Sequence, residues 1–183
     1  MLNAKYIITQ GQNGQPQAQR NPDACGNAWS IQSIQVVPNA DAEMAALTAF
    51  NPKSTAIIDA RHTNYLGGKT TYAPAKARLT NYDPKYLEYS VEGGNAFIVF
   101  SELFYEGAGN DWQAYLDGAP VAHVRVNYLL RGLTVPAGKH EVVFEYAPKS
   151  HFTGQKINYA GSGIILLLLF WMGFKQVRER TNE

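Results

Sequence analysis

The sequence has a single cysteine, Cys25, so no disulfide can form within the chain. It contains no HExxH, P-loop, GxSxG or dinucleotide-binding pattern, and its four histidines stand in no zinc-ligand spacing. Its 16 Lys and Arg residues nearly balance 15 Asp and Glu residues, and no long basic run occurs. Phosphate-backbone binding requires a clustered basic surface. These absences predict no metal, no cofactor and no nucleic-acid partner, and they predict that Cys25 is a small buried residue.

Charge is also missing from one long stretch, Ile157 to Phe174, which has eighteen uncharged residues. At about 1.5 Å per helical residue it reaches roughly 27 Å, close to the approximately 30 Å hydrocarbon core of a bilayer. Lys156 and Lys175 bracket the stretch, and Gly161 and Gly163 are small residues that allow close approach of another membrane helix. A buried core helix would show a polar stripe. The pattern therefore favours a transmembrane helix.

The residues on either side of this stretch bear on its orientation. Lys175, Arg178 and Arg180 follow it, and the positive-inside rule places such a segment in the cytoplasm. The first 156 residues would then lie outside, yet the amino terminus has no basic segment followed by an apolar one that would export them. Two explanations stay open: a tail-anchored protein inserted against its charge bias, or the downstream piece of a longer membrane protein. We favour the second.

The residues before the span predict one β-rich domain, large enough to bury a sizeable core. We expect an extracytoplasmic domain over 1–150, a juxtamembrane linker and transmembrane helix over 151–175, and a cytoplasmic tail over 176–183. Residues 10–22 have little apolar content and are expected to form a loop. A helix is expected over 42–50, capped by Asn39 or Asp41. β-Prone runs occur at 5–9, 27–37, 55–59, 77–82, 86–91, 96–105, 112–116, 121–135 and 141–147.

Three of these runs have informative patterns. Residues 96–105 are almost continuously apolar in their first half, as in a central strand. Asp117-Gly118 is a strong signal for a type I′ hairpin turn. In the last run Val142, Phe144 and Tyr146 alternate with polar or smaller residues, as in a half-buried antiparallel strand. The predicted fold is mainly β: an antiparallel, jelly-roll-like β-sandwich with one short side helix, followed by a single carboxy-terminal transmembrane helix.

Aromatic residues suggest one kind of binding site. Flat rings stack on the apolar faces of sugars, and tyrosine hydroxyls bond to sugar edges. The carbohydrate-binding candidates are Trp112, Tyr115, Tyr128 and Arg131. Packing in the core of a sandwich is the competing interpretation of the same residues.

Acidic residues give a weaker signal. A glycoside hydrolase needs two carboxylates at roughly 5 to 9.5 Å, and the sequence gives no such distance. The carboxylates considered are Glu102, Glu106, Asp111 and Asp117. Asp117 is explained by its turn and Asp111 by the loop before Trp112, so we assign no catalytic residue.

Several segments, in order, resemble the end of a known family. They are NPDACGNAW (21–29), ADAEMAAL (40–47), FNPKSTAIID (50–59), SELFYEG (101–107), DWQAYLDG (111–118), NYLLRGLTVPAGKHEVVFEYAPKSHFTGQKI (127–157) and the final apolar stretch, with MLNAKYIIT (1–9) similar to an internal segment. Together they resemble the carboxy-terminal part of the YfhO-type bacterial membrane protein family. The resemblance implies a polytopic protein similar to GT-C-type glycosyltransferases, with an extracytoplasmic β-domain near its end.

In that superfamily the catalytic acidic residues belong to early extracytoplasmic loops, which this chain does not contain, so the resemblance leaves its enzyme activity undecided. The first hypothesis is an extracytoplasmic domain and last helix that assist transfer of lipid-linked sugar to a cell-envelope glycan or polymer. The partners would be membrane lipid, other transmembrane helices of the parent protein, and envelope glycan or lipid-linked sugar, at the bacterial inner membrane. The second is a stand-alone, membrane-anchored carbohydrate-binding or structural module.

Overall fold

A computed structural model describes residues 1–11, 14–105 and 111–181. The chain divides into two compact units. The first, which we call the sandwich unit, comprises Met1–Tyr105 and Trp112–Tyr146. The second contains the residues from Ala147 onward, and each unit is described by itself.

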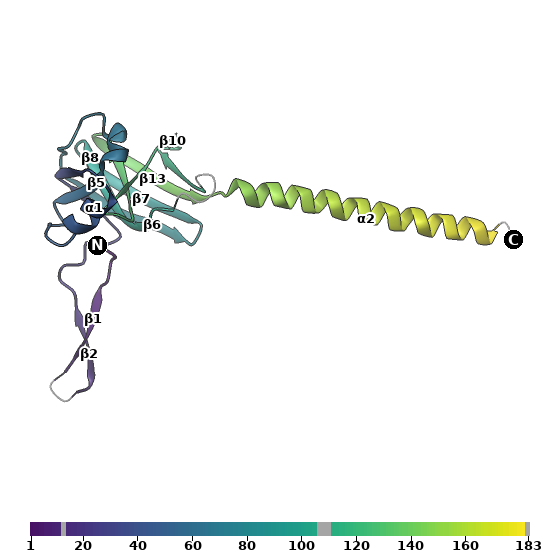
Figure 1. Ribbon diagram of the computed structural model, residues 1–183, viewed down its shortest axis with the longest axis horizontal. Helices are drawn as coiled ribbons and strands as arrows, with labels where there is room; N and C mark the ends of the chain where they lie inside the picture. The colour runs from purple at the N-terminus through teal and green to yellow at the C-terminus, as the bar shows by residue number, and fades with distance from the viewer. Residues whose placement is uncertain (12–13, 106–110, 182–183) are drawn as a thin grey trace. The chain divides into compact units, whose positions relative to one another are not determined.

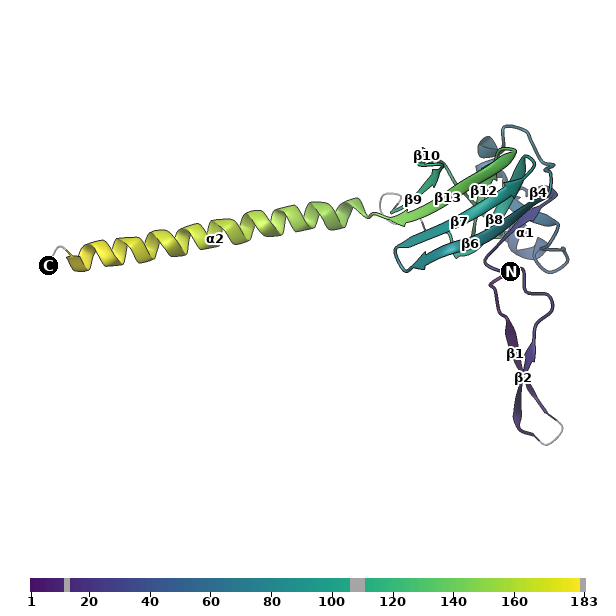
Figure 2. The ribbon, with the colours of Figure 1, turned by 180° about the vertical axis from the view of Figure 1, so that it is seen from behind.

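Two antiparallel sheets form the body of the sandwich unit (Figures 1 and 2). The five-stranded sheet has the order β10-β9-β13-β7-β6, with β6 Ala75–Asp83, β7 Tyr86–Gly93, β9 Trp112–Leu116, β10 Ala119–Val121 and β13 Gly138–Tyr146. The four-stranded sheet has the order β11-β12-β8-β3, with β3 Ala28–Ile31, β8 Ala96–Leu103, β11 Val124–Val126 and β12 Leu130–Val135. The predicted antiparallel β-sandwich is confirmed.

β8 is buried on both faces, as its nearly continuous apolar sequence predicts. It lies between β12 and β3, and residues 96–100 are all 0% exposed. Because successive side chains of a strand point to opposite faces, Ala96, Ile98 and Phe100 enter one core while Phe97 and Val99 enter another. The first core is the sandwich interior, where residues of β8 and β12 meet residues of β7, β9 and β13.

A third layer covers the other face of the four-stranded sheet. It consists of the parallel pair β4 (Ser33–Val37) and β5 (Thr55–Asp59), the helix α1 (Ala40–Ala46) between them, and a 3₁₀ helix, η1 (Ala60–Leu66). Parallel strands need a crossover, which α1 provides. The parallel pair was not anticipated from the sequence.

The side helix α1 confirms the predicted element but not its bounds. Asn39 caps it, since its side-chain oxygen accepts a hydrogen bond from the Ala42 N–H at 2.9 Å. The helix ends at Ala46 rather than continuing to Phe50, because the chain turns at Leu47 and Thr48 to return toward β5.

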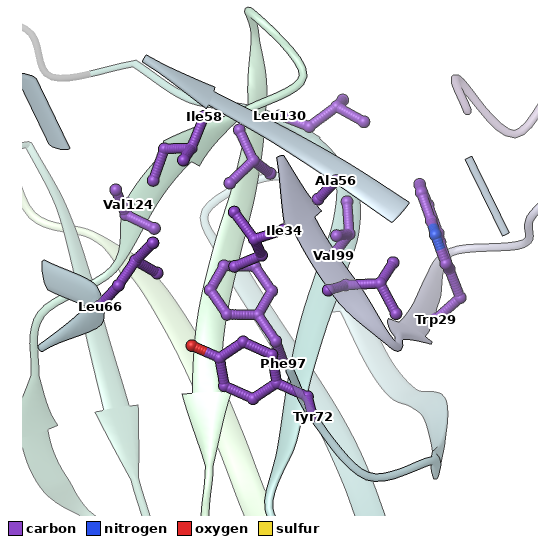
Figure 3. Packing of buried hydrophobic residues seen from close by; sticks show 12 residues of the cluster. Trp29, Ile34, Ala56, Ile58, Leu66, Tyr72, Phe97, Val99, Val124 and Leu130 are labelled. Atoms are coloured by element: carbon purple, nitrogen blue, oxygen red, sulfur yellow. The ribbon is translucent and has the colours of Figure 1, made fainter. Parts of the chain in front are cut away.

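The core beneath this layer is lined by side chains from β3, β4, β5, η1, β8, β11 and β12, together with Tyr72 (Figure 3). Tyr72 and Phe97 pack with ring centroids 5.3 Å apart near its centre. The other buried members are Trp29, Ile31, Ile34, Ala56, Ile58, Leu66, Val99, Val124, Val126 and Leu130. Cys25 packs at the edge of this core and is half-buried, so the expectation of a buried cysteine was wrong.

Two turns explain how the strands in the second half of the chain are divided. Asp117 and Gly118 both have positive φ, 50° and 79°, which confirms the predicted hairpin turn between β9 and β10. Asn127 and Tyr128 also have positive φ, 49° and 70°, and they end β11. Residues 121–135 therefore contribute to three strands, not the one or two expected.

The amino-terminal segment contains a hairpin where a loop was predicted. β1 (Tyr6–Gln10) pairs with β2 (Pro16–Arg20) from Tyr6 opposite Arg20 to Gln10 opposite Pro16. All residues of β2 are exposed, so backbone hydrogen bonds rather than apolar burial hold it. The predicted loop over residues 10–22 was wrong for this reason.

The second unit is dominated by the helix α2 (Lys149–Thr181). Its segment Lys149–Gly173 is long and apolar enough to cross a membrane, and none of its most apolar window is buried. The predicted carboxy-terminal apolar helix is confirmed in this sense.

Gly132 on β12 provides a test of the third-layer core. A Cβ added there would lie 2.5 Å from Cζ of the buried Phe97 ring. We expect Gly132→Ala to lower the free energy of unfolding of the sandwich unit by about 1–3 kcal/mol, measured by thermal unfolding in detergent. Gly154→Ala is the control, because nothing lies within 4 Å of Cβ there. Equal unfolding temperatures for the two variants would contradict this packing.

Candidate functional site

The structure brings two of the four carbohydrate-binding candidates together. The guanidinium carbon of Arg131 lies 4.0 Å from the ring centre of Trp112. Tyr115 lies on the same strand as Trp112 but three residues away, so it projects from the opposite face of the sheet. Tyr128 lies beside Arg125, whose guanidinium carbon is 5.4 Å from its ring centre. The four residues therefore do not form one surface.

Arg131 is 2% exposed and lies between the two sheets. Its guanidinium covers the Trp112 ring and lies 5.1 Å from the ring centre of Phe144. Its Nε donates a hydrogen bond to the Leu103 carbonyl at 3.0 Å, while Nη1 has no hydrogen-bond partner among the described residues. Burial lowers the pKa of Arg131 to about 10, so it remains a cation at neutral pH.

Burial also shifts the pKa values of three groups near Arg131. Burial raises the pKa of Glu102, against the opposing effect of the Arg131 charge. Burial, aided by Arg131, lowers the pKa of His123 to about 4, so its ring is neutral and packs edge-on against Phe144 at 5.5 Å. The buried Tyr89 hydroxyl has no hydrogen-bond partner among the described residues, and burial raises its pKa.

This arrangement limits what Trp112 can bind. Arg131 occupies one face of the indole, and Tyr146, its partner on β13, lies with its ring centroid 5.3 Å away. A sugar stacking on the covered face would have to displace a buried cation from its aromatic neighbours. The Trp112–Arg131 pair therefore joins β9 to β12 inside the sandwich, as packing.

Tyr128 belongs to a polar network between the third layer and the β11–β12 turn. Glu43, which is 0% exposed, accepts hydrogen bonds from the Tyr128 N–H at 2.8 Å and from Nη2 of Arg125 at 2.9 Å. Asn127 exchanges two hydrogen bonds of 2.8 Å with the backbone of Ile57 on β5. These contacts hold the turn against the third layer, and both carboxylate oxygens of the buried Glu43 accept a hydrogen bond.

Tyr115 lies on the outer face of the five-stranded sheet, next to a polar hollow. It is half-buried and opposes Val143 on β13 and Pro120 on β10. Two residues further on, Asp117 is one of the groups lining a hollow of about 300 Å³. The polar lining residues are Thr80, Glu88, Ser90, Asp117, Lys139, His140 and Glu141. Hydroxyl, carboxylate and cationic groups such as these bind polyhydroxylated ligands. Tyr115 does not line the hollow itself; it lies on the same face of the sheet, two residues from Asp117.

Asp117 and His140 form a hydrogen-bonded pair at this hollow. His140 Nδ1 and Asp117 Oδ2 are 2.6 Å apart, and Asp117 Oδ1 accepts a hydrogen bond from the Glu141 N–H at 2.8 Å. The hydrogen bond to Asp117 raises the pKa of His140. The Glu141 N–H, followed by His140, holds the pKa of Asp117 below its usual value.

The remaining chemical candidates are dispersed. His62 lies in η1, His123 before β11, His140 in β13 and His151 in α2. Among the described residues, no three His, Cys, Asp or Glu side chains gather as metal ligands would. Glu102 lies in the interior near Arg131 whereas Asp117 bonds to His140, and Glu106 falls outside the described residues.

Comparison with family models, curated proteins and solved structures found no match to this chain.

The Asp117–His140 pair predicts a pH-dependent stability. Since the pKa of His140 is raised in the folded state, its contribution is complete below about pH 6.5 and is lost as the pH rises through the raised value. Since the pKa of Asp117 is lowered, its contribution is present above about pH 3.8 and is lost as the pH falls through the lowered value. We expect the pair to stabilise the fold most between these limits.

Thermal unfolding as a function of pH measures this effect in the unsubstituted chain and in His140→Gln. The variant should lack the decline in unfolding temperature above about pH 6.5. His123→Gln is the control, because the His123 ring, with its pKa lowered to about 4, is already neutral in this range. Parallel profiles of all three chains above about pH 6.5 would show that the pair contributes nothing to this decline.

Proposed function

We propose that this chain is the extracytoplasmic domain and last membrane helix of a polytopic, YfhO-like bacterial membrane protein. Its sandwich unit lies outside the inner membrane, and its carboxy terminus lies in the cytoplasm. The domain assists transfer of lipid-linked sugar to a cell-envelope glycan or polymer.

The observation that carries the proposal is the exposed apolar surface of α2. Its large apolar side chains between Ile157 and Met172 are 54% to 79% exposed. They occur on every side of the helix, so no single stripe could pack on a protein core and leave the rest in water. Such a helix requires lipid or other apolar helices around it.

Two further features support membership of a helix bundle. Nothing lies within 4 Å of a Cβ placed at Gly161 or Gly163, so a second helix has room to approach. Lys175 follows the apolar segment, together with Arg178 and Arg180, in agreement with a cytoplasmic end.

Two segments that resemble the family support a role of the sandwich unit in the cell envelope. DWQAYLDG (111–118) and PAGKH (136–140) come together through the bond between Asp117 and His140. They meet at the polar hollow beside Tyr115. Residues of both resembling segments thus line one polar hollow, on the face of the sheet that also carries Tyr115.

Membrane anchoring is tested by substituting the centre of the apolar helix. We expect the full chain in liposomes to resist extraction by alkaline carbonate, and Leu167→Arg with Leu168→Arg to be extracted. Each charge at the centre of a span costs about 2.5–3.5 kcal/mol. Ile7→Arg with Ile8→Arg, at exposed positions of β1, is the matched control and should remain anchored. A full-length chain that is monomeric in water without detergent would contradict the proposal.

The sugar-related role is tested by titrating the full chain in nanodiscs with oligosaccharides from bacterial envelopes. We expect millimolar or tighter binding, and we expect Tyr115→Ala to weaken it about five- to tenfold, as loss of roughly 1–1.5 kcal/mol of ring stacking predicts. Tyr128→Phe should bind as the unsubstituted chain does, because its ring packs beside Arg125. No binding at millimolar concentration would overturn this role and leave the anchoring intact.

A further inference from the structure

Exposed apolar side chains are unevenly distributed over the sandwich unit. Beyond residue 20, the described part of this unit has large apolar side chains that are 42% to 62% exposed at only a few positions. Val36 and Met44 belong to the third layer. The other three are Tyr82 at 62%, Leu103 at 61% and Tyr105 at 58%.

These three residues come from two segments, Tyr82 from β6 and Leu103 and Tyr105 from the end of β8 and the residues just after it, which finish at the same end of the sandwich. β13 ends at Tyr146, whose N–H donates a hydrogen bond of 2.8 Å to the Lys85 carbonyl in the β6–β7 turn. Tyr82 lies in β6 just before that turn. We call the end of the sandwich at which β13 finishes the exit end.

The other sheet reaches the exit end through Arg131. Tyr146 is the partner of Trp112 in the sheet, and the Arg131 guanidinium covers the Trp112 ring. Arg131 also donates a hydrogen bond to the carbonyl of Leu103, the last residue of β8. Leu103 and the following Tyr105 therefore lie at the exit end, as Tyr82 does.

The chain leaves the sandwich from this same end. α2 begins at Lys149, three residues after Tyr146, and its uncharged stretch begins at Ile157. The eight helical residues between Lys149 and Ile157 span about 12 Å. The headgroup layer of a bilayer occupies roughly 5–7 Å of this distance. The exit end is thus separated from the uncharged stretch of α2 by only a short segment of chain.

The composition of the exit end indicates the kind of surface that it would contact. Tyrosine has an apolar ring and a polar hydroxyl, and it is enriched where hydrocarbon meets water. The β6–β7 turn carries charges of both signs, Asp83 and Lys85, so attraction to anionic lipid is not the dominant contribution. An aromatic surface of mixed charge fits the headgroup region of a bilayer of any charge.

We propose that the exit end is a membrane-interface surface, with Tyr82, Leu103 and Tyr105 inserted into the lipid headgroup layer. This inference rests on the proposed anchoring by α2 and adds a second contact between the protein and the membrane. It restricts the orientation of the domain, so that the opposite end and the hollow beside Tyr115 are presented away from the lipid or along its surface.

The test uses the full chain in phosphatidylcholine nanodiscs, with Cys25→Ser as the background. Single cysteines replace Tyr82, Leu103 or Tyr105, and each carries an environment-sensitive fluorophore. Lipids bearing a nitroxide at the headgroup should quench these labels about twofold or more, as expected for groups in the interface. Val36→Cys and Met44→Cys are the matched controls, since they are exposed apolar positions of the third layer, and their labels should not be quenched.

A label at Leu167→Cys separates this inference from the proposed anchoring. Quenching of that label by nitroxides deep in the lipid tails, without quenching at the three exit-end positions, would overturn the interface surface and leave the anchor standing. No quenching at Leu167 would overturn the anchor itself. A fluorescence change at the exit end that lipid nitroxides do not quench would show contact with protein, such as a second copy, and would also overturn the inference. Tyr82 lies on β6, whereas Leu103 and Tyr105 lie at and just after the end of β8, so the misfolding of one variant leaves two to decide.

Discussion

The architecture depends on the burial of one strand, β8, from both sides. Ala96, Ile98 and Phe100 pack toward the five-stranded sheet, whereas Phe97 and Val99 pack toward the third layer. A strand with no polar face cannot lie at a surface, so it requires two covering layers. The five-stranded sheet provides one of them, and β4, β5 and η1 provide the other. This packing favours glycine at position 132 of the neighbouring strand β12, because the Phe97 ring occupies the space that a side chain there would need.

The third layer is fixed by polar contacts as well as by apolar packing. Asn127 bonds to both backbone groups of Ile57 in the manner of an adjacent strand, and it adopts positive φ to do so. Glu43 is fully buried and holds both Arg125 and the Tyr128 N–H. A buried carboxylate is costly unless it is paired and hydrogen-bonded, and a displacement of α1 would break these contacts. They therefore determine where the helix α1 sits over the sheet.

The sequence could predict the elements whose signals are local. The apolar run of β8, the Asp117-Gly118 turn, the alternation in β13 and the apolar helix all depend on neighbouring residues, and the structure has each of them. β2 was missed because its residues bury nothing and are held only by backbone pairing with β1. The parallel pairing of β4 and β5 depends on contacts between residues more than twenty positions apart, which periodicity cannot reveal.

The arrangement of the candidate site could be predicted only in part, because it too depends on contacts between distant residues. The two-residue period of a strand already places Trp112 and Tyr115 on opposite faces, so their separation was predictable. The burial of Arg131 was not, because its cover comes from Trp112 on β9 and Phe144 on β13. An arginine in sequence suggests a surface residue or a ligand contact. Only the assembled sheets show that the cation is inside, where it joins β12 to β9.

The sandwich unit and the helix α2 differ in how their apolar side chains are covered. Both apolar cores are assembled from residues up to Phe144, together with half-buried neighbours that also precede α2. The sandwich therefore has complete cores made of its own residues, whereas the apolar surface of α2 is satisfied by none of them. The sandwich therefore buries apolar side chains within itself, whereas we propose that lipid or other helices cover the apolar surface of α2. The short connection after Tyr146 joins the two parts of the chain. Aromatic side chains are suited to a boundary between water and lipid, and for this reason we propose that the exposed Tyr82, Leu103 and Tyr105 of the sandwich lie at the membrane interface.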